Sequence, residues 1–279
     1  MIEAFLNYSF LQNALLAGLL IGLLAPLIGT FVVVQQLSFI ADTLSHVSLA
    51  GIALGLLLQS YTLTIFPPFY FGALFAIIGG VLLEHLRGYF EHYKEAVMPI
   101  ILSLGVALSV IFISAGNGFN SEILGYMFGS ITTVSKLDVV MLGILTIFII
   151  VFIRYFYHTL LALSFNSESA SLLGIKVRTF QFLFIIILST VISLSIKIVG
   201  TLLISALMIT PVTASMRVAK SFKQTLVYSI VFSELSILVG LAASYYLNVP
   251  SGAMIVLFNV LILFVVIFIE WLSKGGFKK

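Results

Sequence analysis

Asp42 and His46 are the two residues whose types and spacing best suit chemistry, and they lie in an otherwise uncharged stretch from Phe39 to Gly51. Residues four apart share one face of a helix, so a helical stretch would present both side chains together. A carboxylate with an imidazole suits a first-row divalent metal ion. Since Zn²⁺ prefers four ligands, a metal path would require two copies of the chain, each supplying Asp42 and His46.

Two other interpretations of this pair stay open from the residues alone. Asp is a favoured helix N-cap, so Asp42 could begin a helix that carries a hydrogen-bonded His46. Ionisable side chains inside membranes also serve as proton relays. The pair therefore marks a candidate site without fixing its chemistry.

A second candidate is the polar segment from Leu163 to Arg178. Its basic flanks, Lys176 and Arg178, predict that it faces the cytoplasm. We expect a short helix that ends at Gly174. Such a helix between membrane spans either caps the bundle or docks a partner, and the residues alone favour the cap.

The elements that must hold these residues are apolar helices. Of the 279 residues, 61% are hydrophobic and 8% are charged, against about 25% charged in soluble domains. A span needs about 20 apolar residues. Apolar segments fall at about 12–34, 44–60, 68–86, 96–115, 137–157, 178–196, 198–216, 224–247 and 250–272. We therefore predict an all-α bundle of eight to nine spans, with residues 1–279 as one transmembrane domain.

The basic residues predict the orientation of the spans. They cluster at the ends of apolar segments, namely at Arg87 and Lys94, at Arg154, Lys176 and Arg178, at Arg217, Lys220 and Lys223, and at Lys274, Lys278 and Lys279. By the positive-inside rule these connections face the cytoplasm, so the net charge of +3 does not indicate nucleic acid. Three full spans before Arg87 would put the N-terminus outside, and a broken second segment would put it inside. Glycines interrupt 116–135, which we expect to be an outer loop with a short helix.

Other polar residues favour structural roles. Asp138 is expected to cap a helix, and Glu234 to form a structural hydrogen bond with Asn259 in the next span. Small residues such as Gly51 and Gly72 should let helices approach closely.

Several chemistries are disfavoured by what the sequence lacks. There is no Cys, no His-Glu-x-x-His metalloprotease motif, no phosphate-binding Gly-x-x-x-x-Gly-Lys-Ser/Thr loop and no Gly-x-Ser-x-Gly motif. An intramembrane enzyme is therefore disfavoured, and the chain is not expected to be an enzyme. If ATP drives transport, another polypeptide must bind it.

Five segments in order resemble the permease subunit of the zinc and manganese branch of ATP-binding-cassette importers. They are the Asp42/His46 stretch, Met127-Phe128-Gly129-Ser130 with Ser135 and Asp138, the Glu168, Ala170 and Gly174-Ile175 segment, Val199 to Leu203 running to Thr210 to Ala214, and Pro250-Ser251-Gly252-Ala253. The resemblance spans nearly the whole chain. It implies a type II-like permease in the cell membrane that works as a homodimer with two cytoplasmic ATPase subunits and an external metal-binding protein.

The resemblance also implies roles for both candidate sites. Asp42 and His46 would line the path as ligands of the transported metal, with no permanently bound cofactor. Residues 164–176 would be the coupling helix that docks on the ATPase, through Phe165, Asn166, Glu168, Ala170, Leu173 and Gly174. Family members often carry more acidic residues near Asn166, so the individual contacts stay open.

The metal and the energy source each have a second candidate. Ala41-Asp42 and Leu49-Ala50-Gly51 look more like zinc members than manganese members, so Zn²⁺ is expected first and Mn²⁺ next. The alternative function is a secondary carrier of metal and protons that acts without an ATPase.

Overall fold

The computed structural model describes residues 8–61, 66–90, 93–116, 118, 121–130 and 134–273. The C-terminal lysines at 274, 278 and 279 lie outside the described residues. The helices are α2 (Ser9–Val34), α3 (Ser38–Ser60), α4 (Pro68–Tyr89), η1 (Lys94–Ala96), α5 (Val97–Ala115), α6 (Ser121–Phe128), α7 (Lys136–Phe165), α8 (Ser167–Leu172), α9 (Val177–Val199), α10 (Ile204–Val218), α11 (Phe222–Leu247) and α12 (Ser251–Ser273). The described residues contain no strand, so the predicted all-α class is confirmed.

Eight helices of the described chain are long and apolar enough to cross a membrane, namely α2, α3, α4, η1 with α5, α7, α9, α11 and α12. The predicted ninth segment, 198–216, contains α10, which is apolar but only 15 residues long. The prediction of eight to nine spans therefore depended on whether this short helix is counted as a span. Length and composition thus indicate a multi-pass membrane protein.

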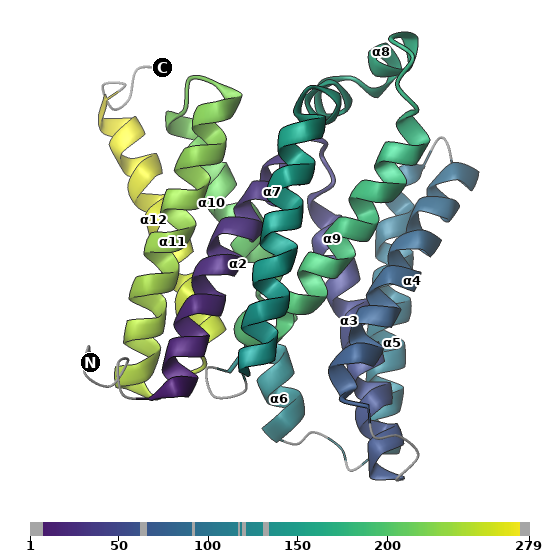
Figure 1. Cartoon of the computed structure of the whole chain (residues 1–279), viewed down its shortest axis with the longest axis vertical. Helices are drawn as coiled ribbons and strands as arrows, with labels where there is room; N and C mark the ends of the chain where they lie inside the picture. Colours follow the sequence, from purple (N-terminus) through teal and green to yellow (C-terminus); the bar gives the residue numbers. More distant parts are fainter. Residues whose placement is uncertain are drawn as a thin grey trace.

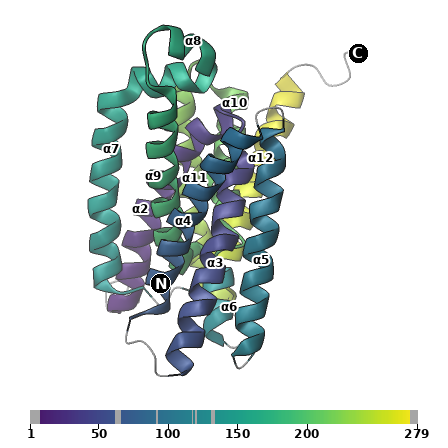
Figure 2. The ribbon, with the colours of Figure 1, turned by 90° about the vertical axis from the view of Figure 1, so that its right-hand side faces the viewer.

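The long helices run side by side, with α8 at one end of the bundle and α6 at the other (Figures 1 and 2). Arg87 lies in the last turn of α4, Arg178 in the first turn of α9 and Arg217 in the last turn of α10, all at the α8 end. The positive-inside rule makes this end cytoplasmic. Three spanning helices precede Arg87, so α2 begins at the outer end, as expected for three full spans.

α3 is buried among its neighbours because small residues admit other helices to its surface. A Cβ on Gly51 would overlap the backbone of Phe71 in α4, and one on Gly55 would lie 2.7 Å from the Cα of Pro68. The predicted close approach is therefore confirmed at the α3–α4 contact. Its consequence is that α3, which carries Asp42 and His46, lies within the bundle.

Candidate functional site

α3 places Asp42 and His46 on a single partly exposed face. They are the fifth and ninth residues of the helix, and both side chains are partly exposed, whereas Ala41, Thr43 and Ser45 are buried. The N-cap residue of α3 is Leu37, so the interpretation of Asp42 as an N-cap is wrong. Two ionisable groups one turn apart thus lie on a partly exposed face of a spanning helix, where such groups are costly.

Ser205 is the side chain that contacts Asp42 from another helix. Its Oγ donates a hydrogen bond of 3.4 Å to Oδ1 of Asp42, and it belongs to the first turn of α10. The two residues are 163 positions apart. Sequence reasoning missed Ser205, because no local pattern links it to Asp42. The position of Ser205 depends on where α10 begins, because Ser205 lies in the first turn of that helix.

The start of α10 is fixed at the outer end of the bundle by a junction of backbone hydrogen bonds between the α9–α10 turn and the end of α6. The N–H groups of Thr201 and Leu202 donate to the carbonyls of Tyr126 (2.9 Å) and Met127 (3.2 Å), and Ser130 N–H donates to Lys197 O (3.1 Å). The turn between α9 and α10 is therefore bonded to the end of α6.

Three glycines allow this junction to close. Gly129 and Gly200 have φ of +78° and +89°, which favours glycine, and a Cβ on either would overlap the backbone of the other segment. A Cβ on Gly252 of α12 would overlap the carbonyl oxygen of Val199. Three of the five family-like segments thus meet here, and together they position Ser205 beside Asp42.

A partly buried ion pair lies beside the junction. Lys197 Nζ is 2.7 Å from Oδ1 of Asp138 and 4.9 Å from the ring centroid of Phe69. Ser135 is the N-cap residue of α7, and Asp138, which was predicted to cap a helix, is the third helical residue and completes a capping box with Ser135. The sequence did not indicate Lys197 as the partner, because the two residues are 59 positions apart.

One chain brings only two metal-binding side chains together at the candidate site. Within the described residues, no group of three or more His, Cys, Asp or Glu side chains is placed to hold a metal ion. A tetrahedral site needs four ligands. Asp42 and His46 would therefore need ligands from outside this chain.

The polar segment forms α8 at the cytoplasmic end, with both ends closed by local hydrogen bonds. Asn166 Oδ1 accepts from the N–H groups of Glu168 and Ser169, each at 3.0 Å. Gly174, with φ of +80°, follows the C-terminal end of α8. Its N–H donates to Ser171 O, and the N–H of Ile175 donates to Ala170 O. The expected helix ending at Gly174 is thus present.

Exposed apolar side chains flank α8 at both ends, beside the exposed polar residues Glu168, Ser169 and Ser171 of the helix itself. Phe165, Leu172 and Leu173 are 70%, 88% and 76% exposed, whereas Ala170 is 1% exposed and packs inward. Sequence reasoning named Phe165 and Leu173 but missed Leu172, the most exposed of the three. These three side chains therefore form an exposed apolar surface at the cytoplasmic end of the bundle.

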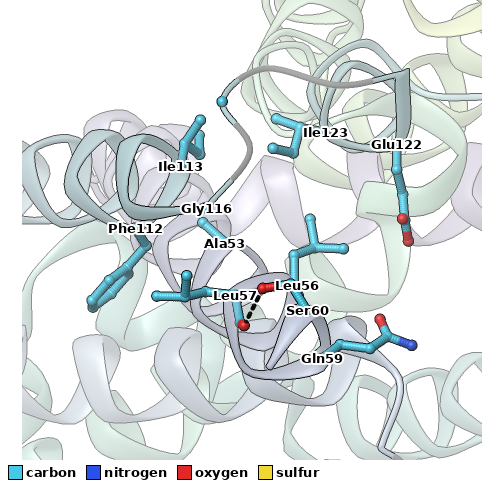
Figure 3. A pocket seen from close by; sticks show the side chains of 11 residues that line it. Ala53, Leu56, Leu57, Gln59, Ser60, Phe112, Ile113, Gly116, Glu122 and Ile123 are labelled. Carbon is cyan, nitrogen blue, oxygen red and sulfur yellow. Dashed lines mark hydrogen bonds between the residues drawn. The ribbon is translucent and has the colours of Figure 1, made fainter. Parts of the chain in front are cut away.

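A separate cavity of about 230 Å³ lies at the outer end between α3, α5 and α6. In Figure 3, Gln59 and Glu122 bring polar groups to its rim, and Ser60 donates to the carbonyl of Leu57. Ala53 is eleven residues beyond Asp42 on α3, a separation of about 16 Å along the helix. The cavity is therefore distinct from the Asp42 site.

The expected hydrogen bond between Glu234 and Asn259 is not formed. Asn259 Oδ1 instead accepts from Ser236 Oγ at 2.9 Å, and Oε2 of Glu234 has no partner among the described residues. Glu234 faces α2, where a Cβ on Gly22 would lie 3.0 Å from its carboxyl carbon. The prediction failed because the pairing depends on the rotation of α11, which local sequence does not fix.

The chain is similar to known membrane transport proteins over nearly its whole length. Residues 7–270 match the model of the ABC 3 transport family. The chain is 31% identical to the manganese import system permease protein ScaB of Streptococcus gordonii, over 96% of this chain and 94% of that protein. It is 28% identical to the high-affinity zinc uptake system membrane protein ZnuB of Haemophilus influenzae, over 90% and 94% of the two chains.

The fold agrees with a solved structure. The structure of PsaBC from Streptococcus pneumoniae in complex with Fab superimposes with a TM-score of 0.83 and 27% identity, over 96% of this chain and 94% of that one. Since the family match covers nearly all of the chain, this membrane protein belongs to the ABC 3 transport family.

Proposed function

We propose that this chain is the permease subunit of an ATP-driven importer of a divalent transition metal, Zn²⁺ first and Mn²⁺ second. The main evidence for this function is that Asp42 and His46 share a partly exposed face of a buried spanning helix. The relatives named for manganese and zinc support metal as the substrate class. The permease itself catalyses no reaction.

The ligand set supports a path shared by two copies of the chain. Asp42 offers a hard oxygen and His46 a borderline nitrogen, a combination that suits Zn²⁺ and Mn²⁺. One copy supplies two ligands, so a two-fold homodimer would supply four. Ser205 would hold the Asp42 carboxylate in place through its hydrogen bond, as groups behind metal ligands commonly do.

The exposed apolar side chains at the two ends of α8 support an ATPase as the energy source. Phe165, Leu172 and Leu173 would dock on a cytoplasmic ATP-binding subunit, with Asn166 and Gly174 holding the helix ends. Movement of that subunit would pass to α7 and α9, which flank α8 in the chain. An external metal-binding protein would deliver the ion to the outer end.

Metal uptake by single variants tests the path. We expect Asp42→Ala and His46→Ala each to lower uptake of radioactive Zn²⁺ in cells depleted of other importers. Loss of a group that only orients a metal ligand costs about 10- to 100-fold in affinity, so loss of a ligand should cost at least about tenfold. His158→Ala is the matched control, since His158 is exposed on α7. Undiminished uptake by both site variants at normal expression would remove this pair from the path.

A reconstitution separates this function from a secondary carrier of metal and protons. The purified chain is placed in liposomes with and without its ATPase subunit, under an imposed proton gradient. We expect metal entry only with the ATPase and ATP. Gradient-driven entry with the chain alone would instead establish the carrier.

The choice of metal is tested by competition. Unlabelled Mn²⁺ added in tenfold excess should leave most of the Zn²⁺ uptake intact. If Mn²⁺ abolishes it and is itself taken up faster, manganese is the substrate.

A further inference from the structure

Three cations gather in a cavity at the cytoplasmic ends of α4 and α9 that the transport site does not use. Arg87 belongs to the last turn of α4, Lys94 to η1 and Arg178 to the first turn of α9. The cavity is about 260 Å³ and is lined by Glu84, Arg87, Gly88, Lys94, Val177, Arg178 and Gln181. Among the described lining residues, three positive charges thus face one carboxylate.

The cavity holds more hydrogen-bond donors than acceptors. Arg87 Nη1 is 3.4 Å from Oε2 of Glu84, while its buried Nε has no hydrogen-bond partner among the described residues. Arg178 reaches across to α4, because its Nη2 is 3.2 Å from where a Cβ on Gly88 would stand. Arg87 alone offers five N–H donors. Such a surplus suits an anion with several oxygens, above all a phosphate.

A second cavity of about 470 Å³ adjoins the basic one and shares Glu84 and Arg178 with it, and His85 and Thr179 also line it. Its lining includes Val81 and Phe182, which lie one helical turn deeper in the membrane on α4 and α9. Ile78, further along α4, is 54% exposed. A phosphate joined to an acyl chain would fill both cavities, whereas a free phosphate would fill one.

Exposed aromatic side chains mark this level as the membrane interface. Tyr89, the last residue of α4, is 74% exposed, and Phe90 and Tyr93, between α4 and η1, are 43% and 73% exposed. Aromatic rings of this kind gather at the headgroup level of a bilayer. The cytoplasmic leaflet is also where anionic lipids attract basic residues.

We propose that Arg87, Lys94 and Arg178 bind the phosphate headgroup of an anionic phospholipid of the cytoplasmic leaflet, with an acyl chain along α4 and α9. Charge complementarity selects the headgroup, and the apolar side chains of Val81, Phe182 and Ile78 beside it select a lipid over a soluble anion. The site is independent of the metal path, because it uses none of the same residues.

Native mass spectrometry of the full chain in detergent tests the site, with phosphatidylglycerol and phosphatidylcholine as probes. The variant is Lys94→Gln with Arg178→Gln, which leaves the Arg87–Glu84 pair intact. We expect the wild type to retain phosphatidylglycerol over phosphatidylcholine and the variant to lose about tenfold of that preference, as expected for a lost charge-assisted hydrogen bond. Unchanged elution on size exclusion verifies the fold.

Three further measurements separate a lipid site from general charge attraction, from a free-anion site and from a protein contact. Arg154→Gln removes an exposed cation of α7 near the same end and should keep the preference; an equal loss would indicate general electrostatic attraction and overturn the site. Inorganic phosphate at the same concentration should not displace the lipid, and displacement would make this a free-anion site. If Lys94→Gln/Arg178→Gln keeps the lipid but no longer copurifies with the ATPase subunit, the cations bind protein instead.

Discussion

Replacing Lys197 with Met would leave the Asp138 carboxylate buried without its cation. The two side chains are 19% and 9% exposed and their charged atoms are 2.7 Å apart. Asp138 Oδ2 also accepts bonds from Ser135 N (2.9 Å) and Ser135 Oγ (2.8 Å). The substitution therefore removes the positive charge while the capping bonds remain.

The expected loss of stability follows from this geometry. Removing one partner of a buried ion pair costs about 3–5 kcal/mol, because the other charge stays buried and uncompensated. The two Ser135 bonds still stabilise the carboxylate and Lys197 is only partly buried, so we expect no more than the lower end, about 3 kcal/mol. That equals a change of about 150-fold in the ratio of folded to unfolded protein.

Denaturant unfolding in detergent micelles measures this loss. Lys197→Met combined with Asp138→Asn removes both charges, so it should recover more than half of the lost stability. Lys136→Met is the control, because Lys136 is exposed at the same end of α7, and surface substitutions usually stay within about 0.5 kcal/mol. If Lys197→Met is as stable as the wild type, or if the double variant recovers nothing, the reasoning is wrong.

Three other predictions concern the segments that position the sites. Gly129→Ala should abolish the yield of monodisperse protein, because Gly129 has φ of +78° and a Cβ there would overlap the backbone of Ile198. Gly143→Ala on α7 is the control and should keep that yield, because a Cβ there meets no other atom of the described residues within 4 Å. Ser205→Ala should weaken the apparent metal affinity, measured as the concentration for half-maximal uptake, by several-fold, because it removes one hydrogen bond of about 1 kcal/mol from Asp42. Ser205→Thr keeps a hydroxyl and should restore part of that affinity. Asn166→Ala should lower the copurification of the ATPase subunit, because loss of an N-cap costs about 1 kcal/mol. Unchanged behaviour of any of these variants would contradict the role given to that residue.

The sequence determined the fold class and most helix positions, because burial in a bilayer demands long apolar runs. Eight of the nine predicted segments correspond to helices long enough to span. The basic residues likewise indicated which end is cytoplasmic, since their charge keeps them out of the hydrocarbon. The caps at Asp138 and Gly174 were also predictable, because helix ends are closed by residues a few positions away.

The candidate site was only half predictable from sequence. Asp42 and His46 stood out because ionisable residues in an apolar stretch are costly, and their spacing of four placed them on one helix face. Only the tertiary structure excluded the N-cap interpretation and added Ser205. That contact depends on the glycine junction that starts α10, where backbone groups from distant segments bond to one another.

The pairing of charges across helices was decided by tertiary structure alone. Asp138 meets Lys197, Asn259 meets Ser236 rather than Glu234, and Arg178 reaches α4 at Gly88. Each pairing depends on the rotation and height of one helix against another. Hydrophobic sequence sets neither closely, because lipid and apolar side chains are nearly equivalent surroundings for a spanning helix.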